Sequence, residues 1–233
     1  MNVTGILLKL AGKENFKLDE RIGTTYIMRI CWQYGWMLVR GIWCGTFHKN
    51  ISKKVFVGKG VKLYEKRYLS VGDNTKLHDH VKIDALSRDG VSIGKRCVIG
   101  AHSAIECTGS LSAVGKGVSI GDNTSFGSNC YFGAAGGIVI GKDVIAGQNI
   151  RFHAENHNYL DKDKPIREQG VTHQGIRVGD NCWIGAGVVF LDGAEIGAGC
   201  VVAANAVVTK KFPCNVVIGG IPARILKYRK EDK

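Results

Sequence analysis

Apolar residues return at every sixth position along the last third of the chain. The series is Val178, Ile184, Phe190, Ile196, Val202 and Val208. Four positions after each of its first five members stands a small or β-branched residue: Cys182, Val188, Ala194, Cys200 and Ala206. An internal repeat this short predicts a solenoid. Three six-residue sides joined by tight corners make an 18-residue triangular coil whose aliphatic residues point inward, and successive coils pair as parallel strands.

The same register continues upstream with interruptions. Its inward positions are Val71, Leu77 and Ile83, then Ile93, Ile99 and Ile105, then Ile120, Phe126 and Phe132, and then Ile140, Ala146 and Phe152, with Val57 and Leu63 at the start. We therefore expect an all-β solenoid over residues 55–218, preceded by a helical segment over residues 1–54 and followed by a tail over residues 219–233 that forms a short helix.

The spacing between equivalent positions locates the insertions. Val71 to Ile93 is 22 residues, Ile93 to Ile120 is 27, Ile120 to Ile140 is 20 and Ile140 to Val178 is 38, compared with 18 from Val178 to Ile196. A solenoid accepts insertions only at its corners, and long ordered loops in compact folds are usually functional. The loop over residues 153–177 is therefore where chemistry is expected.

Composition agrees with a packed solenoid. The chain has 233 residues, 45% of them hydrophobic, with 32 glycines and only 3 prolines, which excludes disorder and collagen. Its 8 cysteines form no CxxC pair, and four of them occupy the small inward slot: Cys97, Cys130, Cys182 and Cys200. We interpret these four as packing residues. Together with an apolar run at residues 6–8 that is too short for a secretory signal, this favours a cytoplasmic protein.

The positive charge is concentrated at the N-terminal end. Residues 1–70 contain 13 Lys and Arg against 4 Asp and Glu, a net +9, whereas residues 71–233 contain 19 against 16, a net +3. A nucleic-acid-binding protein would more often carry its basic residues across the main domain, so no nucleic-acid partner is expected.

The stretch from Tyr26 to Cys44 is apolar and holds Trp32, Trp36 and Trp43. The segment between its two arginines, residues 30–39, is about half the length that crosses a bilayer. Two interpretations stay open and are compatible. The segment is a helical cap on the solenoid, or residues 1–45 form a peripheral contact with the inner face of a membrane, with Lys9, Lys13 and Lys17 facing anionic lipid.

The long loop contains two histidines, His153 and His157. A zinc protease motif requires glutamate directly after the first histidine on a helix, whereas Glu155 comes two positions after it in a loop. A surface histidine, a structural hydrogen bond and a zinc site shared between subunits remain alternatives.

Three segments together resemble the left-handed β-helix acetyltransferases, and most closely the sugar O-acetyltransferases. They are Asn156-His157-Asn158-Tyr159 in the loop, the coil that begins at Val178 and contains Trp183-Ile184-Gly185, and Gly220-Ile221-Pro222-Ala223-Arg224 near the end. The resemblance covers residues 55–228. It implies a left-handed solenoid, a homotrimer, acetyl-CoA as the acyl donor and transfer to the hydroxyl of a sugar or of a glycan, which could be lipid-linked.

The resemblance also suggests roles for individual residues. His157 is the expected general base, and Asn129 and Glu155 are expected at the acceptor, although Asn129 could instead cap a corner and Glu155 could be a solvated carboxylate. The expected coenzyme A groove lies between subunits and uses Trp183, Ala186, Ala204, Thr209, Lys210, Arg224 and Lys227. The chain departs from its relatives at residues 202–206, where Asn205 stands among alanines.

Two other functions fit the same fold. A zinc-dependent hydratase of the γ-carbonic anhydrase type would gather three histidines, for which His102, His153 and His157 are candidates. A structural solenoid without activity is the second. Acceptor identity and the choice between O- and N-acetylation are left open by the motifs.

Overall fold

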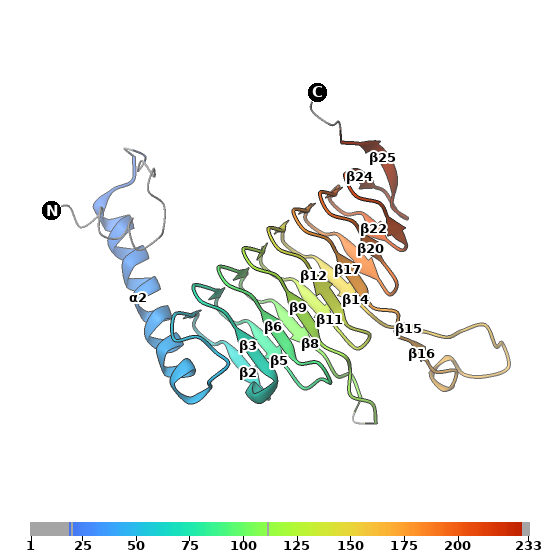
Figure 1. The fold of residues 1–233 in the computed structure, drawn as a ribbon, viewed down its shortest axis with the longest axis horizontal. Helices are drawn as coiled ribbons and strands as arrows, with labels where there is room; N and C mark the ends of the chain where they lie inside the picture. Colours follow the sequence, from blue (N-terminus) through green and yellow to red (C-terminus); the bar gives the residue numbers. More distant parts are fainter. Residues whose placement is uncertain (1–18, 20, 111, 230–233) are drawn as a thin grey trace. The chain divides into compact units, whose positions relative to one another are not determined.

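A computed structural model describes residue 19, residues 21–110 and residues 112–229. Contacts between residues divide the chain into two units, Met1–Trp36 and Met37–Lys233. The second unit is a solenoid of three parallel sheets (Figure 1). The chain passes through the first, second and third sheet in turn and then begins the next coil.

The first sheet holds β1 (Phe56–Val57), β4 (Lys76–Leu77), β7 (Val98–Ile99), β10 (Ser125–Phe126), β13 (Ile145–Ala146), β18 (Trp183–Ile184), β21 (Val201–Val202), β24 (Val216–Gly219) and β25 (Arg224–Tyr228). The second holds β2 (Lys62–Tyr64), β5 (Lys82–Asp84), β8 (Ala104–Glu106), β11 (Tyr131–Gly133), β14 (Arg151–His153), β19 (Val189–Leu191) and β22 (Val207–Val208). The third holds β3 (Leu69–Val71), β6 (Val91–Ile93), β9 (Val118–Ile120), β12 (Ile138–Ile140), β17 (Ile176–Val178), β20 (Glu195–Ile196) and β23 (Lys211–Phe212).

The predicted register is confirmed. Ile93 pairs with Ile120, Ile120 with Ile140, and Ile140 with Val178, so the chain returns to the same ladder after each of the predicted intervals. The inward aliphatic and aromatic residues are buried, and so are the cysteines assigned to the small slot. Burial raises the pKa of the Cys97 and Cys130 thiols, which keeps them protonated packing groups.

Every insertion lies on one edge of the prism. We call the corners between the first and second sheets the first edge, those between the second and third sheets the second edge, and the remaining corners the third edge. The second edge carries the short helix η1 (Lys66–Tyr68), residues 85–90, residues 107–117 and the long excursion over residues 154–175. The first and third edges keep short, repetitive corners, because coils stack there with little space between them.

Close stacking at the corners explains part of the glycine content. A Cβ added to Gly185 would lie 2.5 Å from the backbone nitrogen of Ala204 in the next coil, and one added to Gly147 would lie 2.7 Å from that of Ala186. Neither position has room for a side chain. Asparagines occupy other corners in the left-handed region, which asparagine tolerates better than most residues.

A column of phenylalanines fills the core beneath the long excursion. Phe132 stacks on Phe152 with ring centroids 5.0 Å apart, and Phe152 stacks on Phe190 at 4.9 Å. Phe126 meets Phe132 edge to face at 5.0 Å. Because Phe152 immediately precedes His153, the rigid core ends where the excursion begins.

Helix α2 (Thr24–Phe47) precedes the solenoid, and its last residues pack on the first coil. Met37 is 1% exposed, and the Arg40 Nε donates a hydrogen bond to the Val57 carbonyl oxygen at 2.8 Å. The predicted helical segment is thus present over residues 24–47, whereas Lys9, Lys13 and Lys17 lie outside the described residues. None of the helices in the described ranges is long and apolar enough to cross a membrane.

The predicted C-terminal helix is wrong. Residues 224–228 form strand β25, which runs antiparallel to β24 and pairs Val217 with Lys227 and Gly219 with Arg224. The last coil leaves one edge of β24 with unpaired backbone groups, and the returning chain satisfies them by adding a strand.

Candidate active site on the second edge of the solenoid

The long excursion is a hairpin that projects from the second edge (Figure 1). Strands β15 (Asn156–His157) and β16 (Val171–Thr172) pair antiparallel, with His157 opposite Val171. The outer part contains the short helix η2 (Ile166–Glu168) and is held together by Gln169, whose Nε2 donates to the Asp161 and Lys164 carbonyl oxygens at 2.7 and 2.8 Å. His157 is exposed, and its imidazole has no hydrogen bond to any described residue.

Asp192 anchors the base of this hairpin. It belongs to the next corner along the second edge and is only 5% exposed. Its carboxylate accepts hydrogen bonds from the Gly175 nitrogen at 2.7 Å, the Gln174 nitrogen at 3.0 Å and the Thr172 hydroxyl at 3.1 Å. A buried acceptor satisfied by three donors fixes the strand that returns from the hairpin.

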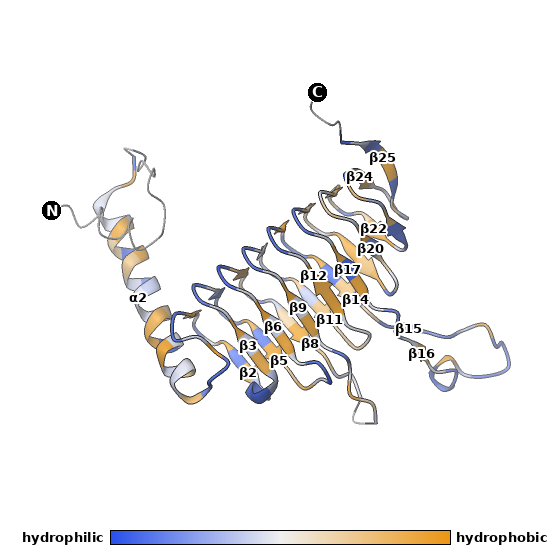
Figure 2. Ribbon diagram, viewed as in Figure 1, coloured by the Kyte–Doolittle hydropathy of each residue, from blue (hydrophilic) through white to orange (hydrophobic). Residues whose placement is uncertain are grey.

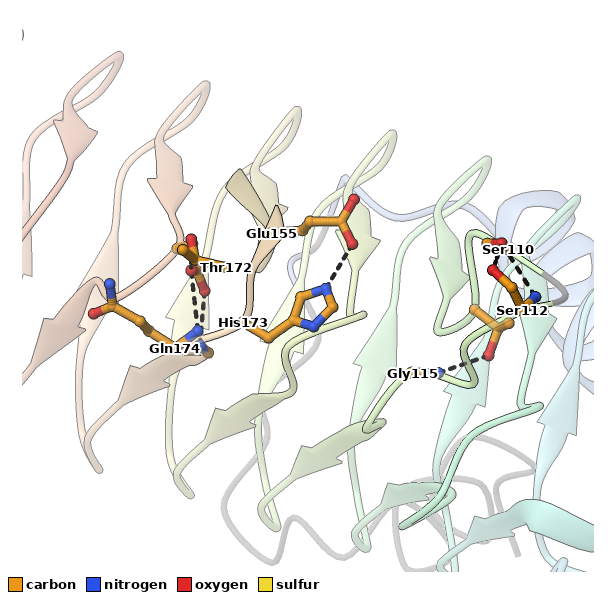
Figure 3. A network of polar contacts seen from close by, with 10 residues as sticks. Ser110, Ser112, Gly115, Glu155, Thr172, His173 and Gln174 are labelled. Carbon is orange, nitrogen blue, oxygen red and sulfur yellow. Dashed lines mark hydrogen bonds and ion pairs between the residues drawn. The ribbon is translucent and has the colours of Figure 1, made fainter. Parts of the chain in front are cut away.

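A second contact joins the two strands of the hairpin at its base. Glu155 and His173 precede and follow the β15–β16 pair, and their side chains point toward one another with 2.7 Å between Glu155 Oε2 and His173 Nε2 (Figure 3). The carboxylate predicted at the acceptor is therefore engaged by His173. Sequence reasoning missed His173, because its partner becomes apparent only once residues 155 and 173 are seen to flank an antiparallel pair.

His153 occupies a different environment from His157. It ends strand β14, and its ring centroid lies 5.7 Å from that of Tyr131 in the preceding coil. Burial, and to a smaller extent the charge of Arg151, lowers the pKa of His153 and keeps its imidazole neutral. His102 lies on the first edge, where its ring stacks on that of His80 with 5.0 Å between centroids.

The three histidines are thus not gathered within one copy of the chain. Among the described residues, no group of three or more His, Cys, Asp or Glu side chains is arranged to hold a metal ion.

An open cavity of about 450 Å³ lies near the end of the solenoid. Its walls are the corner that follows β22 and the start of β25, and the lining includes Thr209, Lys210 and Arg224, three of the residues predicted to bind coenzyme A. The Lys210 ammonium lies 5.7 Å from the centroid of the Phe212 ring, and Lys211 pairs with Glu195 at 3.1 Å. Lys210 and Arg224 therefore have no carboxylate partner among the described residues and offer their positive charge to an anion.

The hairpin and this cavity share the second edge. Strands β14, β19 and β22 are neighbours in the second sheet, so the corners that follow them, which hold the hairpin, Asp192 and Lys210, stack in successive coils. With coils about 4.8 Å apart, the corner at Lys210 lies roughly 10 Å along the edge from the base of the hairpin.

The other predicted site residues lie elsewhere. Ala186 and Ala204 stack in successive corners of the first edge, and Asn129 occupies an earlier corner of that edge with φ of 61°. Trp183 is 61% exposed on the outer face of the first sheet, opposite Ile145. Lys227 is exposed on β25, in the same sheet. One copy of the chain therefore presents the predicted residues on separate faces.

Comparisons with known proteins agree with this geometry. The family model "Bacterial transferase hexapeptide (six repeats)" matches residues 175–210, and "Hexapeptide repeat of succinyl-transferase" matches residues 90–109 and 117–150. The chain thus carries the hexapeptide repeats that these models describe. Its fold is a left-handed parallel β-helix, as the resemblance implied.

Among curated proteins, the chain is 30% identical over 184 residues to a probable acetyltransferase of Mycobacterium tuberculosis, covering 75% of this chain and 50% of that protein. It is 33% identical over 91 residues to the galactoside O-acetyltransferase of Escherichia coli, covering 39% of this chain and 43% of the relative. The chain spans about half the length of the curated relatives it matches.

A solved structure of similar fold is AntD, an N-acyltransferase from Bacillus cereus in complex with dTDP and 3-hydroxybutyryl-CoA. The two chains are 19% identical, with a TM-score of 0.52, and the match covers 76% of this chain and 81% of AntD. At this identity the likeness concerns the fold.

Proposed function

We propose that the protein is an O-acetyltransferase that moves the acetyl group of acetyl-CoA to a hydroxyl of a sugar or glycan, with His157 as general base. The observation that carries the proposal is the shared second edge, which aligns an exposed imidazole on an anchored hairpin with a cavity lined by Lys210 and Arg224. Galactoside O-acetyltransferase among the relatives, and the acyl-CoA bound in the AntD structure, support this choice of donor and acceptor.

The chemistry requires little from the protein, because the thioester is already activated. The acceptor hydroxyl gives its proton to an imidazole nitrogen of His157 while its oxygen attacks the thioester carbonyl carbon. A carbon–oxygen bond forms, the carbon–sulfur bond breaks, and the departing thiolate takes the proton back from the imidazolium. An exposed imidazole without a competing hydrogen bond can accept this proton and return it.

The donor site follows from charge. Lys210 and Arg224 would neutralise phosphate oxygens of coenzyme A, and the cavity between them has the volume to hold part of a nucleotide. Lys227 lies on the same strand as Arg224 but outside the cavity lining, and Ala186 and Ala204 place only small side chains on the first edge. We further propose that copies of the chain associate, as the resemblance to trimeric relatives implies, so that the first edge of one copy lies beside the second edge of its neighbour.

The test is acetyl transfer from radiolabelled acetyl-CoA to a panel of galactosides, maltose and amino sugars. His157→Ala should lower turnover by roughly 10² to 10⁴-fold, because the general base is lost. The Kd for coenzyme A should stay unchanged, because His157 does not bind coenzyme A in this proposal. His102→Ala is the matched control and should retain activity, since that ring stacks on His80 at another edge. Full acetyl-transfer activity in His157→Ala would contradict the proposal. A wild-type protein that hydrates carbon dioxide, and loses that activity in both variants, would instead favour the zinc-dependent hydratase.

A further inference from the structure

Helix α2 uses one narrow face to contact the solenoid. A Cβ added to Gly41 would lie 1.6 Å from the carbonyl oxygen of Val55, and one added to Gly45 would lie 2.8 Å from that of Ile51. Met37, one turn earlier on the same face, is buried. The last part of the helix is therefore held backbone to backbone against the first coil, and its orientation about its own axis is fixed.

Helix α2 is largely apolar (Figure 2), and the side of its second half that faces away from the coil is exposed. Positions spaced by four residues fall on one side of a helix, and this side carries Val39, Trp43 and Phe47, which we call the aromatic stripe. These side chains are 54%, 71% and 65% exposed, respectively. By the 3.6-residue period, the stripe lies about half a turn from the buried face.

The stripe is not an incidental scatter of apolar residues. The rings of Trp43 and Phe47 meet edge to face with centroids 5.2 Å apart. Contiguous exposed aromatic surface of this kind usually marks an interaction site.

The chain that follows the helix is strongly basic. Residues 37–70 contain 8 Lys and Arg against 1 Asp or Glu, a net +7, and the single acidic residue, Glu65, pairs with Arg67 at 3.2 Å. The exposed basic side chains are Lys49, Lys53, Lys54, Lys59, Lys62 and Arg67. The coil against which α2 packs therefore carries a concentrated positive charge, and Lys49 follows the last residue of the stripe by two positions.

We infer that the aromatic stripe and the basic first coil dock the protein on an anionic lipid surface, with the second half of α2 lying in the plane of the membrane. Tryptophan rings are favoured at the boundary between headgroups and acyl chains, and lysines beside them attract anionic headgroups. This inference is independent of the acetyl transfer proposed above.

The experiment is cosedimentation of the full chain with phosphatidylcholine vesicles and with vesicles containing 30% phosphatidylglycerol, a fraction of roughly the size found in anionic membranes. The wild-type protein should sediment with the anionic vesicles, and binding should weaken as salt rises. Trp43→Ser/Phe47→Ser should weaken partitioning at least about ten-fold, because the rings supply the apolar contact. Leu160→Ser, which alters an 85% exposed residue of the hairpin, is the matched control and should bind like the wild-type protein.

A second pair of variants tests the electrostatic part. Each lysine near an anionic surface changes partitioning by about five-fold, so Lys53→Gln/Lys54→Gln should bind about 25-fold more weakly, whereas Lys162→Gln/Lys164→Gln in the hairpin should not. Circular dichroism and Tm confirm that each variant is folded. Wild-type protein that stays in the supernatant with anionic vesicles would overturn the inference. A stripe variant that binds anionic vesicles as the wild type does would also overturn it. So would a stripe variant that differs from the wild type only by a smaller molecular mass in solution, which would show that the stripe joins two copies of the chain.

Discussion

At the scale of single residues, Asp192 shows how a corner of one coil determines the position of a functional loop in another. Its carboxylate accepts two backbone N–H groups and one hydroxyl from the strand that leaves the hairpin. The apolar repeat explains why neighbouring positions are buried, but it gives no reason for a buried carboxylate at this corner. The burial of this carboxylate is explained only by the hydrogen-bond donors that the excursion places around it.

Replacing Asp192 by Asn should loosen the hairpin while the solenoid stays folded. The amide retains one acceptor oxygen but cannot satisfy both backbone donors, so we expect a loss of roughly 1–3 kcal/mol in the local stability of the hairpin base. Hydrogen exchange of the Gln174 and Gly175 amides, together with the rate of limited proteolysis in residues 158–170, measures this loss. Asp143→Asn, which alters an exposed corner carboxylate bonded to Asn123, is the control and should change neither.

The contact between Glu155 and His173 allows a test of whether Glu155 positions the hairpin or binds the acceptor. If Glu155 acts only by holding the hairpin, Glu155→Ala, His173→Ala and the double variant should lower kcat by the same factor, because each removes the same contact. The expected factor is on the order of ten-fold, set by misplacement of His157. A larger rise in KM for the acceptor in Glu155→Ala alone would instead assign Glu155 to substrate binding.

At the scale of elements, polar contacts between coils add specificity to a stack whose core is uniform. Glu106 on β8 accepts a hydrogen bond from Lys82 Nζ on β5 at 2.7 Å and one from the Tyr131 hydroxyl on β11 at 3.1 Å. These contacts hold the pKa of Glu106 below its ordinary value of 4.5, with the Lys82 hydrogen bond the largest cause and the Tyr131 bond a smaller one. Three consecutive strands are thus joined on their outer face.

The stabilisation from Glu106 should depend on pH. Because its folded-state pKa is lowered, the contribution is fully present above the ordinary carboxyl value and is lost as pH falls through the lower folded value. Glu106→Gln should lower Tm by roughly 2 °C at pH 7, since the pair is partly exposed, and the difference from wild type should vanish in acid. Thermal unfolding of both proteins between pH 7 and pH 3 tests this. A Tm difference between Glu106→Gln and wild type that stays constant across this pH range would contradict the prediction. Glu195→Gln, which removes a single exposed ion pair, is the comparison variant.

At the scale of the whole molecule, the repeat predicted the solenoid because burial imposes the same demand at each turn of the prism. Residues such as Ile120 and Val178 must face inward whatever lies between them, so their spacing located the excursion and its length. What the repeat could not predict lies where it stops. The strand at residues 224–228 depends on an open sheet edge, and the contact of Glu155 with His173 depends on a pairing inside the loop.

The division of the predicted site between edges leads to a test of assembly. Within one copy, Asn129, Ala186 and Ala204 lie on the first edge, whereas the hairpin and the basic cavity lie on the second. If each active site combines His157 of one copy with Asn129 of its neighbour, as our proposal of associated copies implies, then two impaired variants can complement each other. His157→Ala and Asn129→Ala should each be nearly inactive at low acceptor concentration.

Coexpression of these two variants should restore about a quarter of wild-type activity. In randomly mixed assemblies, each site receives an intact His157 with a probability of about one half and an intact Asn129 with the same probability. The measurement is acetyl transfer by the mixed protein, purified through two different tags and checked for mass by light scattering. The same variants mixed without exchange of subunits are the control. Mixed assemblies that stay inactive would show that His157 and Asn129 do not combine across copies, which would contradict the proposed arrangement of the two edges.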